Sequence, residues 1–113
     1  MTKTKRLISG AVFILASSLS IKAHAEFITL TSYTLWSNTY NANFIRITDA
    51  GTPVNPSGCT DLDSYMVLST LSKEAQSRIF ATLLTAKALN KPVQIFVSGC
   101  EQSRPAIQNV TIN

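Results

Sequence analysis

Apolar and β-branched residues gather in five short segments that predict strands. In residues 93–98, for example, Val93, Ile95 and Val97 alternate with Gln94, Phe96 and Ser98, the two-residue period of a strand. Turns rich in Asn, Pro or Gly separate the segments. The predicted strands are residues 27–36, 44–48, 64–69, 93–98 and 106–112.

The period changes to that of an amphipathic helix over residues 73–89. Apolar residues recur there at three- and four-residue spacing: Ala75, Ile79, Leu83 and Ala86. Ser72 is the predicted N-cap of this helix. Asn90 is the predicted left-handed residue after its last turn, and Pro92 prevents the helix from continuing.

The resulting order is strand-strand-strand-helix-strand-strand, which predicts a mainly β fold with one helix (α+β). For a small domain this order fits a five-stranded, partly closed OB-like barrel with the helix between its third and fourth strands. An open antiparallel sheet with one helix packed on a face is the alternative.

Residues 1–25 have the pattern of a secretory signal peptide. A basic start with Lys5 and Arg6 precedes an apolar run over residues 7–19, and Ala23-His24-Ala25 supplies the small-x-small cleavage pattern. The run is too short to span a bilayer, which needs about 20 residues. We therefore expect one domain over residues 26–113, secreted or periplasmic in a bacterium, without a membrane span after cleavage.

Cleavage would change the charge of the chain. It would remove four of the ten basic residues, so that six basic and six acidic residues remain and the net charge is zero. Phosphate binding needs clustered cations, so this balance argues against a nucleic-acid partner and against binding anionic lipid by charge. The basic residues of the helix and the following segments are expected to be solvated: Arg78, Lys87, Lys91 and Arg104.

Cys59 and Cys100 are the two cysteines of the chain. Export would place them where disulfides persist, so we expect them to pair. Closing a loop of about 40 residues would stabilise the fold by roughly 4 kcal/mol in the chain-entropy model. Free thiols or half of a metal site are the alternatives, but the mature chain has no histidine or further cysteine to complete a zinc site.

The same lack of histidine argues against an enzyme. Without histidine, neither a Ser-His-Asp nor a Cys-His system can be assembled. Asp61 and Asp63 are a candidate carboxylate pair for glycoside chemistry, but their spacing beside Pro and Gly is commoner in solvated loops. We predict no catalytic residue, no metal ligand and no cofactor.

Aromatic and amide side chains cluster in residues 33–43, which predicts a ligand-binding region. Aromatic rings stack on the apolar faces of sugars, and amides bond to hydroxyl groups. Trp36 has a second interpretation, in which it fills the core and its indole N–H bonds to a carbonyl. The candidate residues are Tyr33, Trp36, Asn38, Tyr40, Asn41 and Asn43.

Residues 83–113, LLTAKALNKPVQIFVSGCEQSRPAIQNVTIN, carry a resemblance to known proteins. A helix leads through a basic residue and Pro-Val into an alternating strand, Gly-Cys, a loop with Pro and a last strand. This tail is similar to that of many short exported bacterial proteins, and it resembles the B subunits of subtilase cytotoxin and typhoid toxin. The resemblance implies an OB-fold subunit that forms a homopentamer and binds sialylated or other glycans on host cells, with a catalytic A subunit as partner. It transfers no binding residue to this chain.

Two functions are therefore expected. The first is an exported, non-enzymatic, toxin B subunit-like domain that binds a carbohydrate or a protein surface as an oligomer. The second is a small monomeric periplasmic inhibitor or accessory protein that caps another protein. Small size, neutral charge and one disulfide fit both.

Overall fold

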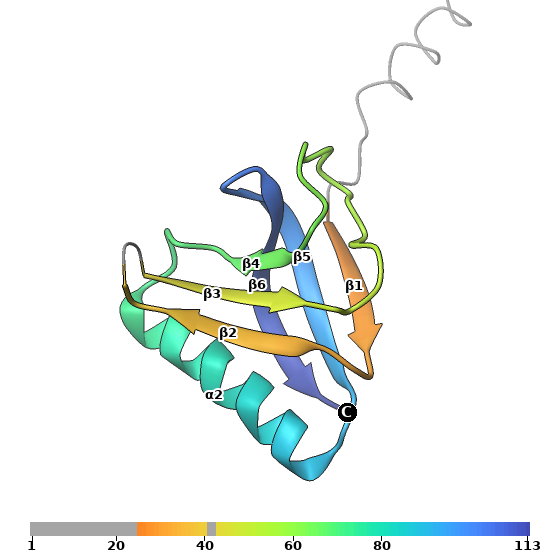
Figure 1. The fold of residues 1–113 in the computed structure, drawn as a ribbon, viewed down its shortest axis with the longest axis vertical. Helices are drawn as coiled ribbons and strands as arrows, with labels where there is room; N and C mark the ends of the chain where they lie inside the picture. The colour runs from red at the N-terminus through yellow and green to blue at the C-terminus, as the bar shows by residue number, and fades with distance from the viewer. Residues whose placement is uncertain (1–24, 41–42) are drawn as a thin grey trace, which may run out of the picture.

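The computed structural model describes residues 25–40 and 43–113, which form a mainly β fold with one helix (Figure 1). The elements are β1 (Ala25–Leu30), β2 (Thr34–Asn38), β3 (Phe44–Thr48), β4 (Tyr65–Val67), α2 (Lys73–Leu89), β5 (Val93–Glu101) and β6 (Arg104–Ile112).

The strands form one six-stranded mixed sheet in the order β1-β5-β6-β4-β3-β2. β4 and β6 are parallel, with Met66 opposite Ala106, and the other neighbours are antiparallel. In Figure 1, β2 and β3 run across the direction of β1 and β5, so the sheet is strongly coiled. It is not closed, since β1 and β2 are its two edges. The α+β class is confirmed, but a five-stranded barrel is not.

The predicted first strand, residues 27–36, is two strands in the structure. β1 pairs with β5 and β2 pairs with β3, and the chain turns from one to the other at residues 31–33. Tyr33, at this bend, has its side chain in the core, where only 5% of the residue is exposed. The uninterrupted β-branched and aromatic sequence gave no sign of the bend, because it arises from the two separate pairings.

The predicted loop over residues 101–105 is also shorter than expected. β5 and β6 are joined by Gln102 and Ser103 alone, both with positive φ (48° and 68°). Two positive φ values in succession are typical of the tight turns that suit the twist of a β-hairpin. The turn lacks the usual Asn-Gly pair, and Pro105 lies inside β6, so the sequence pattern favoured a loop.

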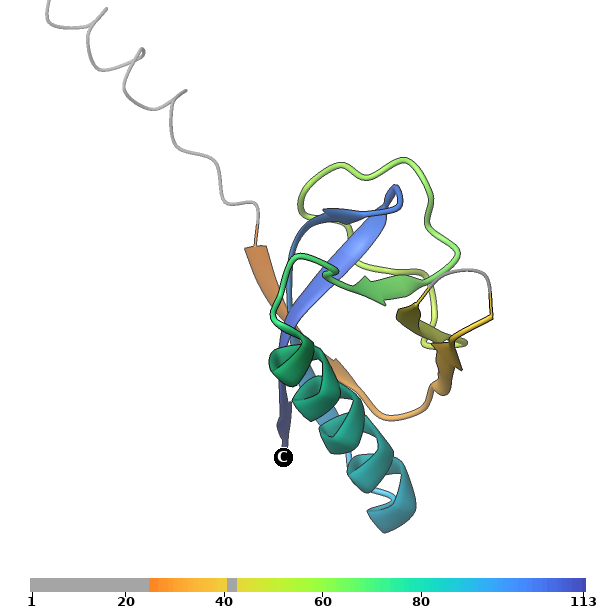
Figure 2. The same ribbon diagram turned by 90° about the vertical axis from the view of Figure 1, so that its left-hand side faces the viewer.

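The helix agrees with its sequence prediction in both bounds and caps. Ser72 Oγ accepts a hydrogen bond from the Ala75 N–H at 3.1 Å. Asn90 is left-handed (φ 54°), and its N–H points to the carbonyls of Ala86 and Lys87. Figure 2 shows α2 at the lower end of the coiled sheet, where it packs against β6.

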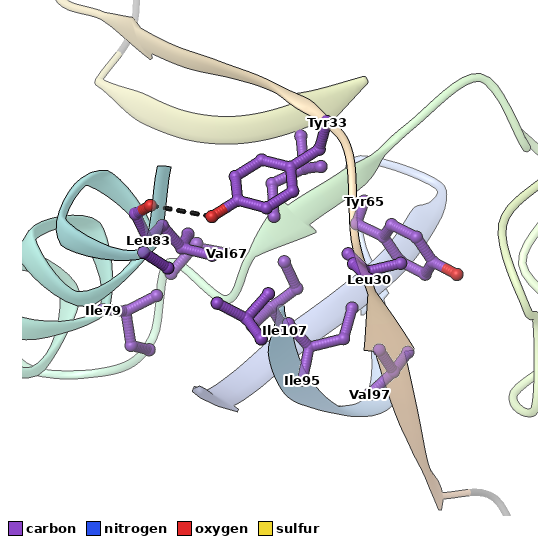
Figure 3. Close-up of a cluster of buried hydrophobic side chains, with 12 residues drawn as sticks. Leu30, Tyr33, Tyr65, Val67, Ile79, Leu83, Ile95, Val97 and Ile107 are labelled. Atoms are coloured by element: carbon purple, nitrogen blue, oxygen red, sulfur yellow. Dashed lines mark hydrogen bonds between the residues drawn. The ribbon is translucent and has the colours of Figure 1, made fainter. Parts of the chain in front are cut away.

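The core lies between α2 and the inner face of the sheet (Figure 3). Burial of these apolar side chains is the main favourable term in folding a domain of this size. The Tyr33 side chain lies at the edge of the core next to α2, where its hydroxyl donates to the Leu83 carbonyl at 2.7 Å. Residues with no exposed surface include Ile47, Leu83, Ala86, Val93, Ile95, Val97 and Ile107.

Cys59 and Cys100 form the predicted disulfide, with their Cα atoms 5.8 Å apart. The bond ties the irregular segment between β3 and β4 to the end of β5. Asn55, in the same segment, also fixes the backbone at Cys59. Its side-chain amide donates to the Cys59 carbonyl (2.8 Å) and accepts from the Cys59 N–H (2.7 Å).

The predicted signal peptide, residues 1–25, lies outside the described residues apart from Ala25, which begins β1 opposite Ser98. Across residues 25–40 and 43–113, the structure has no helix with the length and apolar character needed to cross a membrane.

Candidate functional site

The β2–β3 hairpin carries most of the ligand-binding residues predicted from the sequence. Trp36 and Asn38 lie on β2, Tyr40 follows β2, and Asn43 precedes β3. Tyr33 is placed elsewhere, in the core between the sheet and α2. Asn41 lies outside the described residues.

Trp36 is on the outer face of the hairpin, and 47% of it is exposed. Its indole Nε1–H donates to the Thr48 hydroxyl at 2.8 Å. The core interpretation of Trp36 was therefore wrong. Strand alternation explains its position, because Leu35, the neighbour of Trp36, faces Ile47 on the core side.

The tip of the hairpin is held by a local side-chain contact. The Asn38 carbonyl oxygen Oδ1 accepts a hydrogen bond from the Tyr40 N–H at 2.9 Å, which is the Asx-turn geometry that asparagine favours in turns. Tyr40 itself is 90% exposed. Its ring is thus presented to solvent beside the amide of Asn38.

An open cavity of about 220 Å³ lies between this hairpin and the first turns of α2. It brings Asn38 and Asn43 together, while Trp36 and Tyr40 remain outside its wall. Most of the residues that line it carry an amide or a hydroxyl group, one carries an ammonium group and two are apolar. The lining residues are Ser37, Asn38, Thr39, Asn43, Phe44, Ile45, Lys73, Gln76 and Ser77.

The helix residues of this cavity were not predicted from the sequence. Lys73, Gln76 and Ser77 are about 30 residues away from the hairpin in the chain. Gln76 also holds the chain before the helix, since its amide donates to the Leu71 carbonyl at 2.9 Å. No local signal would have found these residues, because only the packing of α2 places them opposite the hairpin.

The carboxylate pair considered for catalysis is bound to an arginine instead. Arg104 contacts Asp63 at 2.8 Å and 3.0 Å and Asp61 at 3.0 Å. The hydrogen bonds from Arg104, followed by the one from the Ser64 hydroxyl, hold the pKa of the Asp63 carboxyl well below its usual range. The hydrogen bonds to Asp63 also raise the pKa of Arg104. The expectation that Arg104 is a solvated single charge was wrong: only 20% of its side chain is exposed.

A smaller cavity of about 110 Å³ lies at the other end of α2, beside the bend between β1 and β2. Lys87 lines this cavity and is exposed, as expected, but its ammonium also donates to the Tyr33 carbonyl at 2.6 Å and lies 5.0 Å from the Tyr33 ring centre. Desolvation raises the pKa of the Tyr33 hydroxyl. These contacts fix the bend and the helix to each other.

Within the part of the chain that the structure describes, no three or more His, Cys, Asp or Glu side chains are grouped so as to hold a metal ion. Comparisons of the chain with protein-family models, with curated proteins and with solved structures found no match. The site is therefore interpreted from its own geometry.

Proposed function

We propose that this protein is an exported, non-enzymatic domain that binds a carbohydrate in the cavity between the β2–β3 hairpin and α2. The observation that carries the proposal is the lining of that cavity. Amides of Asn38 and Asn43 and hydroxyls of Ser37 and Ser77 can donate to and accept from sugar hydroxyls. Phe44 lines the same cavity and adds apolar surface, which suits the apolar face of a sugar.

Preorganisation supports this choice of site. The Asn38 amide is already oriented by the Tyr40 N–H, and one wall is a regular helix, so little ordering would be needed on binding. The open rim and modest volume fit a terminal sugar better than an extended chain.

The strand pairings support an OB-like barrel as the finer description of the fold. β1 and β2 are consecutive in the chain, and one pairs with β5 while the other pairs with β3, as two halves of one bent strand would. A parallel β4–β6 pair and a helix between β4 and β5 complete that topology. In this description the hairpin belongs to a face that such barrels commonly use for ligands.

We also propose that the protein acts as an oligomer, similar to toxin B subunits, after loss of its signal peptide. A single shallow site binds a sugar weakly, and several copies on one assembly would raise the avidity. The mass of the exported protein, intact and under native conditions, tests both points. The intact mass should correspond to a chain that begins at Glu26, and the native mass should be a multiple of the mass of that chain. A monomer would favour the inhibitor or accessory function.

The cavity itself is tested by filling it. Ser77→Trp places a large ring at its helix wall without deleting a hydrogen bond that supports the fold, so binding on a glycan array should fall at least about tenfold. Ala88→Trp is the matched control, because Ala88 is exposed on the same helix about 16 Å further along its axis. Equal binding by the two variants, both folded, would refute the cavity as the site.

A further inference from the structure

Arg46 is a cation without an acidic partner among the described residues. It lies on β3, on the outer face of the hairpin and opposite Trp36. Its guanidinium carbon is 5.7 Å from the Trp36 ring centre and 5.6 Å from the Phe44 ring centre. The two rings hold the guanidinium by cation–π contact. Its Nε is buried without a hydrogen-bond partner.

The nearby acids are occupied elsewhere. Asp63 is near enough for the charge of Arg46 to contribute to its lowered pKa, but both of its oxygens receive hydrogen bonds from Arg104. Asp49 accepts from the Thr34 hydroxyl at 2.8 Å. Arg78 and Arg104, the other arginines of the described chain, each have a carboxylate within 3.0 Å. Arg46 is thus held in position, partly desolvated and uncompensated, a state that a carboxylate from outside would relieve.

The surroundings of Arg46 favour a protein over a small molecule as the source of that carboxylate. Phe44 borders the larger cavity, but Trp36 and Arg46 line neither of the two cavities described above, and small ligands bind mainly in concave sites. A half-exposed Trp beside a partly buried Arg is instead typical of the residues that dominate protein interfaces. β2 beside them is a sheet edge, and its sequence from Thr34 to Asn38 has no Pro or charge to prevent another strand from pairing.

We propose that the outer face of the hairpin, formed by Trp36, Phe44 and Arg46, docks an extended acidic segment of a partner protein. A Glu or Asp carboxylate of that segment accepts hydrogen bonds from the Arg46 Nη atoms, and the segment packs on the Trp36 ring along the free edge of β2. Phe44 is shared with the lining of the carbohydrate cavity, whereas Trp36 and Arg46 lie outside that lining, so the two sites are neighbours with different key residues.

Trp36 makes the proposal testable, because it is the only tryptophan and its fluorescence reports on the surface directly. The probe is a blocked seven-residue peptide of alternating Thr and Glu, which places its carboxylates on one face of a strand. We expect a saturable change in Trp36 emission that weakens with salt. The matched peptide with Gln in place of Glu should bind at least about tenfold more weakly.

Two substitutions locate the contact. Arg46→Met keeps an unbranched stem between the rings but removes the charge, and should weaken binding of the Glu peptide at least about tenfold. Arg46→Lys keeps the charge but loses the planar fork and should give an intermediate loss. Arg78→Met, at an exposed arginine on α2, is the control and should bind as the unchanged protein does. Near-ultraviolet circular dichroism checks the fold of each variant.

Three results would overturn the proposal. The first is equal binding of the Glu and Gln peptides, and the second is an Arg46→Met variant that is folded and binds normally. The third is a saturable response to glucuronate with none to the Glu peptide, which would assign the surface to a sugar acid. Filling the cavity with Ser77→Trp should leave peptide binding unchanged, so this proposal and the carbohydrate proposal can fail separately.

Discussion

Single side chains in this protein take their roles from what faces them across the sheet. Arg46 and Arg104 are both arginines of β-strands, yet Arg104 contacts two carboxylates whereas Arg46 lies between aromatic rings. Tyr33 and Trp36 are three residues apart, and one is in the core while the other is half exposed. Charge or aromatic character alone does not distinguish the members of either pair.

The contact between Asp63 and Arg104 predicts an acid dependence of stability. Because the folded pKa of Asp63 is lowered, its contribution is present above the unfolded pKa of about 4 and is lost as the pH falls toward the folded pKa. The Asp63 side chain is 54% exposed, so solvent screening limits this to about 1 kcal/mol. Asp63→Asn should lower the free energy of unfolding at pH 6 and have a much smaller effect at pH 2, measured by urea titration.

Glu74→Gln is the control for this measurement, since Glu74 and Arg78 form an exposed pair on one helix with more than 70% of each side chain in solvent. Its effect should be smaller at pH 6. An Asp63→Asn deficit of the same size at pH 2 and pH 6 would show that charge is not its cause.

Helix α2 is the element that the sequence predicts best, because local signals determine its bounds. A serine cap, an acid in the first turn and a left-handed residue at the end act within one or two turns of the backbone. The three-to-four-residue spacing of Ile79, Leu83 and Ala86 also identifies the buried face, and all three are buried. What α2 faces is decided elsewhere in the chain.

Adjacent leucines on α2 test the assignment of its faces. Leu83 has no exposed surface, whereas Leu84 is 51% exposed. Leu83→Ala should destabilise the protein by about 2–5 kcal/mol through lost burial and a cavity. Leu84→Ala should change stability by no more than about 0.5 kcal/mol. Thermal and urea unfolding measure both, and similar values would show that the buried face is wrong.

The left-handed end of α2 gives a second test at this scale. Asn90 has φ 54°, a conformation that costs most L-residues about 1 kcal/mol or more. Asn90→Ala should therefore lower the stability by about 1 kcal/mol, whereas Asn90→Gly should be neutral or slightly stabilising. If the melting temperatures of the two variants were the same, the helix would not end in this geometry in solution.

The molecule as a whole depends on contacts that fasten its long irregular segment between β3 and β4. Cys59 is bonded to Cys100, the Asp61 N–H donates to the Ser103 carbonyl at 2.8 Å, and Arg104 holds Asp61. All three contacts join this segment to the β5–β6 hairpin. A small core supplies limited stability, so such fastening matters for a domain of this size.

Removing the disulfide should therefore have a large effect. A loop of this length, with the cysteines separated by 41 positions in the sequence, predicts a loss of about 4 kcal/mol for the double change Cys59→Ser and Cys100→Ser. Reducing agent should destabilise the unchanged protein by a similar amount and leave the double variant unaffected. Unchanged unfolding of the parent protein on reduction would contradict the role of this bond.

The sequence by itself determined the features that arise within a few residues or from exclusion: the helix and its caps, most strands, the α+β class and the pairing of the two cysteines. Only the tertiary structure decided the bend at residues 31–33, the binding of Asp61 and Asp63 by Arg104, and the meeting of the hairpin with Lys73, Gln76 and Ser77. The physical reason is the distance along the chain over which each interaction acts. Capping and periodicity act along the local backbone, whereas a bend, an ion pair or a cavity wall depends on which distant strands pair and on the face that each then presents.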